Sequence, residues 1–137
     1  MLTKESVLTY RVPYADTDQA AVVYYGNYLA YFERGRSSVL RDMGYPYSNF
    51  EKLGYRLPVI EAHVDYKSFA CYEDELDLHG YFEVTDKLRL KAHHEIRRGD
   101  TLIASGYTIH LCFSIERQKP ARFPDAFYTK LEDYCNA

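Results

Sequence analysis

Residues 26–43, GNYLAYFERGRSSVLRDM, carry the pattern that decides the fold. Apolar side chains recur here at the spacing of an α-helix, and charged residues fall between them. Gly44 and Pro46 follow directly, as is common where a helix ends. Gly35 costs about 1 kcal/mol relative to alanine inside a helix, so we expect it to let the backbone approach a sheet closely. The apolar members of the pattern are Tyr28, Leu29, Phe32, Val39, Leu40 and Met43.

The segments on both sides of this helix alternate polar and apolar residues, as half-buried strands do. The link at residues 85–87 and the link at residues 98–100 are short and turn-like, which favours antiparallel hairpins. The last alternating run is much longer than an ordinary strand, so we predict a curved sheet that bends around the helix. The predicted strands cover residues 5–12, 59–69, 76–84, 88–97 and 102–115.

The order of these elements predicts an α+β fold, in which a curved antiparallel sheet is wrapped around one long central helix. A short helix after Pro124 completes the chain, with Phe127 and Leu131 spaced for one face. At 137 residues and 47% hydrophobic, the chain suits one domain over residues 1–137. Such a sheet leaves edges and one face that need cover, which favours a homo-oligomer.

The composition excludes several classes of protein. A net charge of −3 provides no field that would attract nucleic acid. No stretch reaches the roughly 18 uninterrupted apolar residues of a membrane span, and the N-terminus lacks a signal-peptide core. The three cysteines are widely spaced and form no CxxC pair, which argues against a disulfide framework or a zinc site. We therefore expect a cytoplasmic protein with reduced thiols.

The histidines and the common nucleotide motifs give no sign of a metal or cofactor. His93 and His94 are adjacent on a predicted strand and point to opposite faces, so they cannot share a metal in the usual way. The sequence contains no GxSxG, no P-loop and no GxGxxG motif. We expect neither a metal nor a cofactor.

One group of residues could carry chemistry, namely Asp16-Thr17-Asp18 with Tyr25 at the opening of the helix. A helix N-terminus presents unpaired amides and a partial positive charge, which suit a carbonyl that becomes an oxyanion. A carboxylate beside it could act as a base or a nucleophile. The plainer interpretation is that the aspartates form a turn or a helix cap. Spacing alone leaves both interpretations open.

Three blocks of sequence resemble the signature of the 4-hydroxybenzoyl-CoA thioesterase-like hotdog family, which includes the tol-pal-associated acyl-CoA thioesterases. They are residues 14–18 (YADTD), 22–29 (VVYYGNYL) and 31–36 (YFERGR). Weaker likeness continues through Val64-Asp65-Tyr66, Ala70, Asp74, Leu76 and residues 119–124 (KPARFP), so that it covers nearly the whole chain. The resemblance implies a hotdog fold and hydrolysis of an acyl-CoA to free acid and CoA, by a homodimer or homotetramer.

The resemblance also implies roles for individual residues. Asp18 matches the catalytic carboxylate, which either attacks the thioester or activates a water. The backbone amide at Tyr25 would polarise the thioester carbonyl, and Asn27 and Tyr28 would shape the start of the helix. Basic residues near the ends of strands would bind the phosphates of CoA. They match Lys87 and Lys119, with Arg117 and Arg122 close by.

The chain departs from the family pattern at three positions. Ala21 stands where glycine is frequent, Tyr25 where many members have histidine, and Phe69 where proline is frequent. These changes affect the substrate more than the reaction. Two other functions stay open, a non-catalytic module that binds acyl-CoA or acyl-carrier protein, and a hydro-lyase. The hydro-lyase would require a histidine at the helix, and residues 14–44 contain none.

Overall fold

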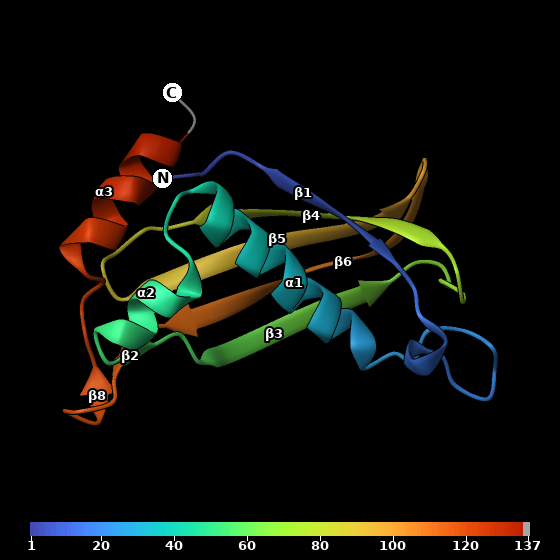
Figure 1. Cartoon of the computed structure of the whole chain (residues 1–137), viewed down its shortest axis with the longest axis horizontal. Coiled ribbons are helices and arrows are strands. Elements are labelled where there is room, and N and C mark those ends of the chain that lie inside the picture. The colour runs from blue at the N-terminus through green and yellow to red at the C-terminus, as the bar shows by residue number, and fades with distance from the viewer. Residues whose placement is uncertain (136–137) are drawn as a thin grey trace.

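A five-stranded antiparallel sheet curves around helix α1 (Asn27–Asp42), which lies along its inner face (Figure 1). In this computed structural model, which describes residues 1–135, the strand order is β1-β4-β5-β6-β3. This is the predicted arrangement of the hotdog fold. The strands of the sheet are β1 (Ser6–Arg11), β3 (Val59–Tyr66), β4 (Glu75–Glu83), β5 (Arg89–Arg98) and β6 (Thr101–Leu111).

Alternation along the strands decides which side chains face the helix. Along β4 and β5, residues that are buried alternate strictly with residues that are partly exposed. His94 points inward and stacks on Phe32 of α1, whereas its neighbour His93 stacks on Tyr81 on the outer face. A Cβ at Gly106 of β6 would clash with the backbone of β3 and touch the Phe32 ring. Glycine therefore allows α1 and the sheet to pack closely here.

Helix α1 buries one face along its whole length, as its period predicts. Its N-terminal half, including Tyr31 and Phe32, packs in one hydrophobic cluster, and its C-terminal half, including Val39 and Leu40, packs in a second. Gly35 is buried between these halves and faces His94 of the sheet, in the position expected for it. The prediction for Leu29 is wrong, because this side chain is 40% exposed.

The region after α1 contains elements that the sequence pattern did not predict. The segment around Gly54 and Pro58, for which the sequence pattern indicates no helix or strand, follows helix α2 (Tyr47–Lys52) and includes strand β2 (Tyr55–Arg56). The predicted strand over 102–115 is interrupted at Cys112, which belongs to neither β6 nor β7, although its amide still donates to the Leu88 carbonyl at 2.8 Å. Its last part, β7 (Phe113–Ser114), joins a small second sheet in the order β2-β7-β8, where β8 is Lys119–Pro120.

Helix α3 (Asp125–Tyr134) is the C-terminal helix that the sequence predicts. Phe127 and Leu131 are fully buried and join the cluster at the C-terminal half of α1. The helices described in residues 1–135 are all too short or too polar to cross a membrane.

Candidate active site

Residues 13–26 form the loop that connects β1 to α1. The loop begins with a 3-10 turn (Tyr14–Asp16) and continues as a small hairpin, which is closed by a bridge between Thr17 and Val23. The Val23 amide donates to the carbonyl of Ala70 at 2.8 Å, which ties the hairpin to the segment between β3 and β4. The motif therefore lies at the end of the molecule where α1 begins.

Asp18 lies at the tip of this hairpin with its side chain exposed. Its amide donates to the Val22 carbonyl at 2.9 Å, and its Oδ1 accepts a hydrogen bond from the Ala20 amide at 2.8 Å. Ala21 adopts a φ of 65°, a left-handed conformation that costs a non-glycine residue about 1 kcal/mol. Oδ1 thus stabilises the turn, and within residues 1–135 no protein group bonds to Oδ2.

Asp16 has the opposite environment. Its Oδ2 accepts hydrogen bonds from the hydroxyls of Tyr10 at 3.0 Å and Tyr31 at 2.8 Å. Burial, and secondly the bond to Asp16, raise the pKa of Tyr31. The Asp16 carbonyl accepts hydrogen bonds from the Tyr24 amide and the Asn27 side chain, both at 2.9 Å. Asp16 therefore anchors the loop to the helix, a role that the sequence did not distinguish from that of Asp18.

The start of α1 is not capped by any side chain. Gly26 is the N-cap residue and makes no side-chain cap hydrogen bond, so the interpretation of either aspartate as a cap of α1 is wrong. In the described part of the chain, no acceptor pairs with the backbone amides of Tyr25 and Gly26. The Tyr25 side chain is 64% exposed. Two unpaired amides at the positive end of a helix are suited to bind an oxygen that develops negative charge.

Asp18 and Tyr25 belong to the same loop, and both act on the phenol of Tyr24. The Tyr25 phenol raises the pKa of the Tyr24 phenol, and the charge of Asp18 adds a smaller rise. The Tyr24 and Tyr25 rings are 4.7 Å apart. The hydroxyl of Tyr66, on β3, donates to the Tyr25 carbonyl at 3.2 Å. Tyr66 has a place in the family likeness but no predicted role at the site, because alternation along β3 does not indicate a contact with the loop before α1.

Asn27 and Tyr28 support the helix start from within the chain. Asn27 is half-buried and donates from its side chain to the Asp16 carbonyl. Tyr28 is buried, and its hydroxyl accepts a hydrogen bond from the Ala70 amide at 3.3 Å. The neighbouring Phe69 is 70% exposed. These residues fix the backbone around the unpaired amides.

The basic residues of the sequence prediction lie elsewhere. Lys87 is in the link between β4 and β5, with its ammonium group 5.1 Å from the centre of the Tyr128 ring of α3. Lys119 is in β8 and lines a cleft of 640 Å³ together with Arg117 and Arg122. Helix α3 and strand β8 lie at the opposite end of the molecule from the start of α1 (Figure 1). One chain therefore does not place Lys87 or Lys119 beside the loop that carries Asp18.

The main clefts formed by residues 1–135 are lined by neither Asp18 nor Tyr25. One of these clefts lies beneath α1 and contains Arg36 and His110. Arg36 had a signal in the sequence, since it stands four residues after Phe32 and four before Leu40, on the buried side of the helix. In the same described residues, no three His, Cys, Asp or Glu side chains gather as a metal site would require.

Comparison with known proteins agrees with this architecture. Residues 12–131 match the model of the thioesterase-like superfamily. The chain is 32% identical over 117 residues to YneP of Bacillus subtilis, provisionally named an acyl-CoA thioesterase, with 85% of each chain covered. It is 29% identical over 116 residues to the acyl-CoA thioesterase YbgC of Haemophilus influenzae, with 83% of this chain and 85% of that one covered.

Solved structures extend the likeness. A hypothetical protein from Thermus thermophilus superposes with a TM-score of 0.90 at 30% identity, covering 98% of this chain and 100% of the other. The 1,4-dihydroxy-2-naphthoyl-CoA thioesterase from Synechocystis superposes with a TM-score of 0.86 at 26% identity, covering 95% and 97%. The fold and the site loop thus define a hotdog protein of the thioesterase class. The chain belongs to the thioesterase-like superfamily.

Proposed function

We propose that the chain hydrolyses an acyl-CoA thioester at the start of α1. The observation that carries the proposal is the pair of unpaired amides at Tyr25 and Gly26, on the same loop as the exposed carboxylate of Asp18. The names of the relatives YneP and YbgC support the same reaction class. In the proposal, the Tyr25 amide donates to the thioester oxygen, and Asn27 and Tyr28 hold that amide in position.

Asp18 would act by one of two routes. Its free oxygen either forms a bond to the thioester carbon or removes a proton from a water that does so. The carbon–sulfur bond then breaks, and CoA leaves as a thiolate that takes up a proton. On the first route, water then hydrolyses the anhydride between the acyl group and Asp18; on the second, the attacking water has already supplied the hydroxyl of the free acid. The oxyanion formed on the way is stabilised by the helix amides, whose orientation is fixed before the substrate binds.

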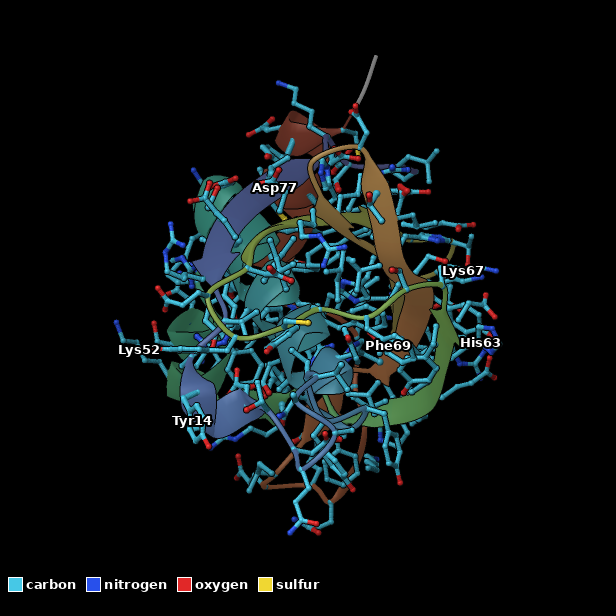
Figure 2. All side chains as sticks on the ribbon, turned by 90° about the vertical axis from the view of Figure 1, so that its right-hand side faces the viewer. Tyr14, Lys52, His63, Lys67, Phe69 and Asp77 are labelled. Carbon is cyan, nitrogen blue, oxygen red and sulfur yellow. The ribbon has the colours of Figure 1, made fainter. Side chains whose placement is uncertain are left out.

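A second copy of the chain would complete this site. Seven of the eight residues of β3 are exposed, and β3 is an edge strand with one unpaired side. Tyr66 of this edge contacts Tyr25, with ring centres 6.5 Å apart. Figure 2 views the molecule from the end where α1 begins, and Phe69 and His63 lie on the β3 side of this end. Pairing along β3 would cover the exposed aromatic rings and enclose the thioester.

The oligomer also gives the basic residues a role in the proposal. Lys119 on β8 and Lys87 beside α3 lie at the opposite end of the molecule from the start of α1 (Figure 1), and in the proposal a neighbouring chain brings them to the substrate. The cleft lined by Lys119, Arg117 and Arg122 is wide and strongly basic, as phosphate groups of CoA require. The free cysteines fit the proposed cytoplasmic setting, where thiols stay reduced.

A thiol-release assay over acyl-CoA substrates of varied length and aromaticity tests the proposal. We expect turnover of at least one substrate, with loss of turnover in Asp18→Asn. Tight binding of acyl-CoA without thiol release would instead support a binding module.

Sedimentation of the native chain, compared with a Val64→Pro variant that disrupts the β3 edge, tests the dimer; a monomeric native chain would contradict it.

A further inference from the structure

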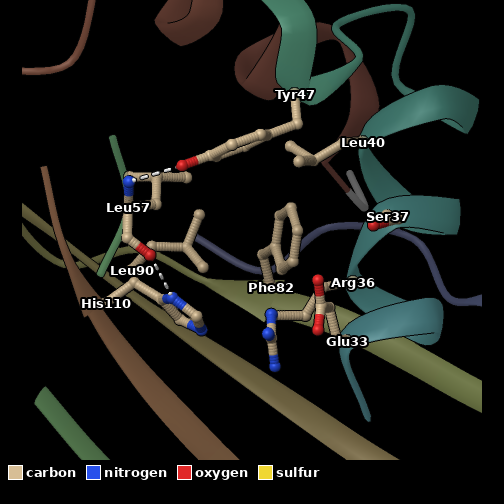
Figure 3. Close-up of a pocket in the computed structure, with 9 residues that line it drawn as sticks. All are labelled: Glu33, Arg36, Ser37, Leu40, Tyr47, Leu57, Phe82, Leu90 and His110. Carbon is tan, nitrogen blue, oxygen red and sulfur yellow. Dashed lines mark hydrogen bonds between the residues drawn. The ribbon is translucent and has the colours of Figure 1, made fainter. Parts of the chain in front are cut away.

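A cavity of about 200 Å³ lies between the middle of α1 and the sheet (Figure 3). Its walls are apolar and polar in about equal parts. Leu40, Leu57, Phe82 and Leu90 form the apolar part, and the polar part includes Glu33, Ser37 and Tyr47. Two polar side chains face each other across it, Arg36 from α1 and His110 from β6. The cavity is separate from Asp18, and nothing in the reaction described above uses Arg36.

Arg36 brings a positive charge into this cavity without an anionic partner. Its only hydrogen bond within the described residues goes to the Thr108 hydroxyl, at 3.3 Å. None of the ion pairs in the described chain includes it. Burial lowers the pKa of Arg36, and the charge of Glu33 opposes this from too far away to form an ion pair. A sheltered guanidinium with open donors is costly unless an anion binds there.

Among the residues described, the neighbouring hydrogen bonds leave most N–H groups of Arg36 unpaired, because the Glu33 carboxylate on the same wall does not bond to them. His110 Nδ1 must donate to the Leu57 carbonyl at 2.9 Å, because a carbonyl can only accept. Burial lowers the pKa of His110 to about 4, so its Nε2 is an acceptor at neutral pH. It accepts a hydrogen bond from the Thr108 hydroxyl at 2.9 Å. The Thr108 oxygen then accepts from Arg36. The remaining N–H groups of the guanidinium have no acceptor in residues 1–135.

Tyr47 adds a second donor from the opposite wall. Its hydroxyl oxygen accepts a hydrogen bond from the Leu57 amide at 3.1 Å, drawn as a dashed line in Figure 3. The hydroxyl proton is therefore available to a guest in the cavity. A partly apolar cavity with a guanidinium and a phenol hydroxyl suits a carboxylate at the end of a hydrocarbon chain.

We propose that this cavity binds the far end of the acyl group and that Arg36 pairs there with a carboxylate, so that the preferred substrates are ω-carboxyacyl-CoA thioesters. The inference rests on the proposed function, in which the thioester lies at the start of α1. Arg36 is nine residues beyond Asn27, or about 14 Å along the helix axis. An acyl chain of medium length has about this length when it is extended.

Binding of thioether analogues tests the cavity without any need for hydrolysis. The probes are S-alkyl-CoA and S-(ω-carboxyalkyl)-CoA in pairs of equal length, titrated by calorimetry against the native chain. At the best length, the carboxylate probe should bind about 10- to 100-fold more tightly. Arg36→Met should abolish this preference, because methionine keeps the stem and loses the charge. Arg36→Lys should keep part of it, since the charge stays and the planar fork is lost.

Two matched variants sharpen the test. Arg34→Met makes the same substitution on the exposed side of the helix, where the guanidinium lies 4.5 Å from the Tyr10 ring centre, and should leave the preference unchanged. Glu33→Gln removes the nearby negative charge and should increase the preference. Arg36→Met should melt at or above the native temperature, because it removes an unpaired sheltered charge.

The outcomes separate this inference from the proposed function. Equal binding of both probes at every length, or a preference that survives in Arg36→Met, would overturn the carboxylate site even if thioesters are hydrolysed. A preference for the carboxylate probe that Arg36→Met removes would support the site even if thiol release is never observed.

Discussion

The two ends of α1 differ in whether their open backbone groups have hydrogen-bond partners. At the C-terminal end, the Gly44 amide donates to the Arg41 carbonyl and the Tyr45 amide to the Leu40 carbonyl, which satisfies backbone groups that a helix end leaves open. Tyr45 and Leu40 also pack in the same cluster. At the N-terminal end, the Tyr25 and Gly26 amides have no acceptor in residues 1–135. The closed end stabilises the fold, and the open end is available for a substrate.

The largest effect we predict concerns the open end. Asp18→Asn should lower kcat on the best acyl-CoA by about 100-fold or more, because the carboxylate is lost as base or nucleophile. The melting temperature should change little, since the amide oxygen can still accept from Ala20. Steady-state thiol release on purified protein measures the first effect. Near-native turnover in this variant would remove Asp18 from the mechanism.

A second prediction concerns the packed C-terminal half, which lies over His110. Burial lowers the pKa of His110 to about 4, below the 6.5 of an unfolded histidine. At pH above 6.5 both states are neutral; as the pH falls from 6.5 towards 4, only the unfolded state gains the proton. The free energy of unfolding should therefore fall by about 2.5 kcal/mol between pH 7.5 and pH 4.5 through this group.

Urea titrations at the two pH values measure this loss. His110→Asn keeps a donor for the Leu57 carbonyl but cannot take up a proton, so it should lose about 2 kcal/mol less than the native chain over the same interval. Equal losses in the two proteins would show that His110 is not the group responsible.

The third prediction compares the two aspartates of the open end. Asp16→Ala removes the acceptor of the Tyr10 and Tyr31 hydroxyls and should lower the free energy of unfolding by about 2 kcal/mol. Asp18→Ala should change it by less than about 0.5 kcal/mol, because that side chain is exposed. Chemical denaturation of the pair gives both values. Similar losses in the two variants would contradict the division of roles.

The fourth prediction concerns the closed end. Gly44 has a φ of 79°, a conformation that an alanine reaches only at a cost. Gly44→Ala should therefore lower the free energy of unfolding by about 1 kcal/mol and leave kcat unchanged. Thermal melting with parallel thiol release checks both statements. A loss of turnover in the folded variant would show that the C-terminal end of the helix also affects catalysis, which would contradict the comparison.

The smallest effect should come from the Tyr25 phenol. Tyr25→Phe keeps the backbone amide, so kcat should change by less than about threefold. The measurement is thiol release under saturating substrate. A fall of more than about tenfold would mean that the hydroxyl, and not the amide alone, contacts the reacting group.

The sequence predicted the central helix, the five main strands and the C-terminal helix because their hydrophobic periods are long and regular. It did not predict α2, because six residues make less than two helical turns, nor the small sheet, because a strand of two residues shows only one alternation. Neither length is enough to reveal a period. Leu29 was assigned to the buried face on hydrophobicity alone, although Tyr28 occupies that face one residue earlier.

The candidate site was predicted in part. The resemblance identified the loop and the start of α1, and the structure brings Asp18 and Tyr25 to the same end of the molecule. The resemblance singled out Asp18 as the catalytic carboxylate, but the anchoring role of Asp16 could not be predicted, since it depends on two tyrosines from β1 and α1. The cavity at Arg36 depends on long-range packing of β6 and α2 against α1, which local patterns do not contain.

The central claim is that the open amides of α1 bind the thioester oxygen beside Asp18. A crystal structure of the Asp18→Asn variant with an intact acyl-CoA tests it most directly. We expect the thioester oxygen about 3 Å from the Tyr25 amide nitrogen, with the side chain at position 18 facing the thioester carbon. A thioester bound at another place, with the Tyr25 amide still without a partner, would contradict the account.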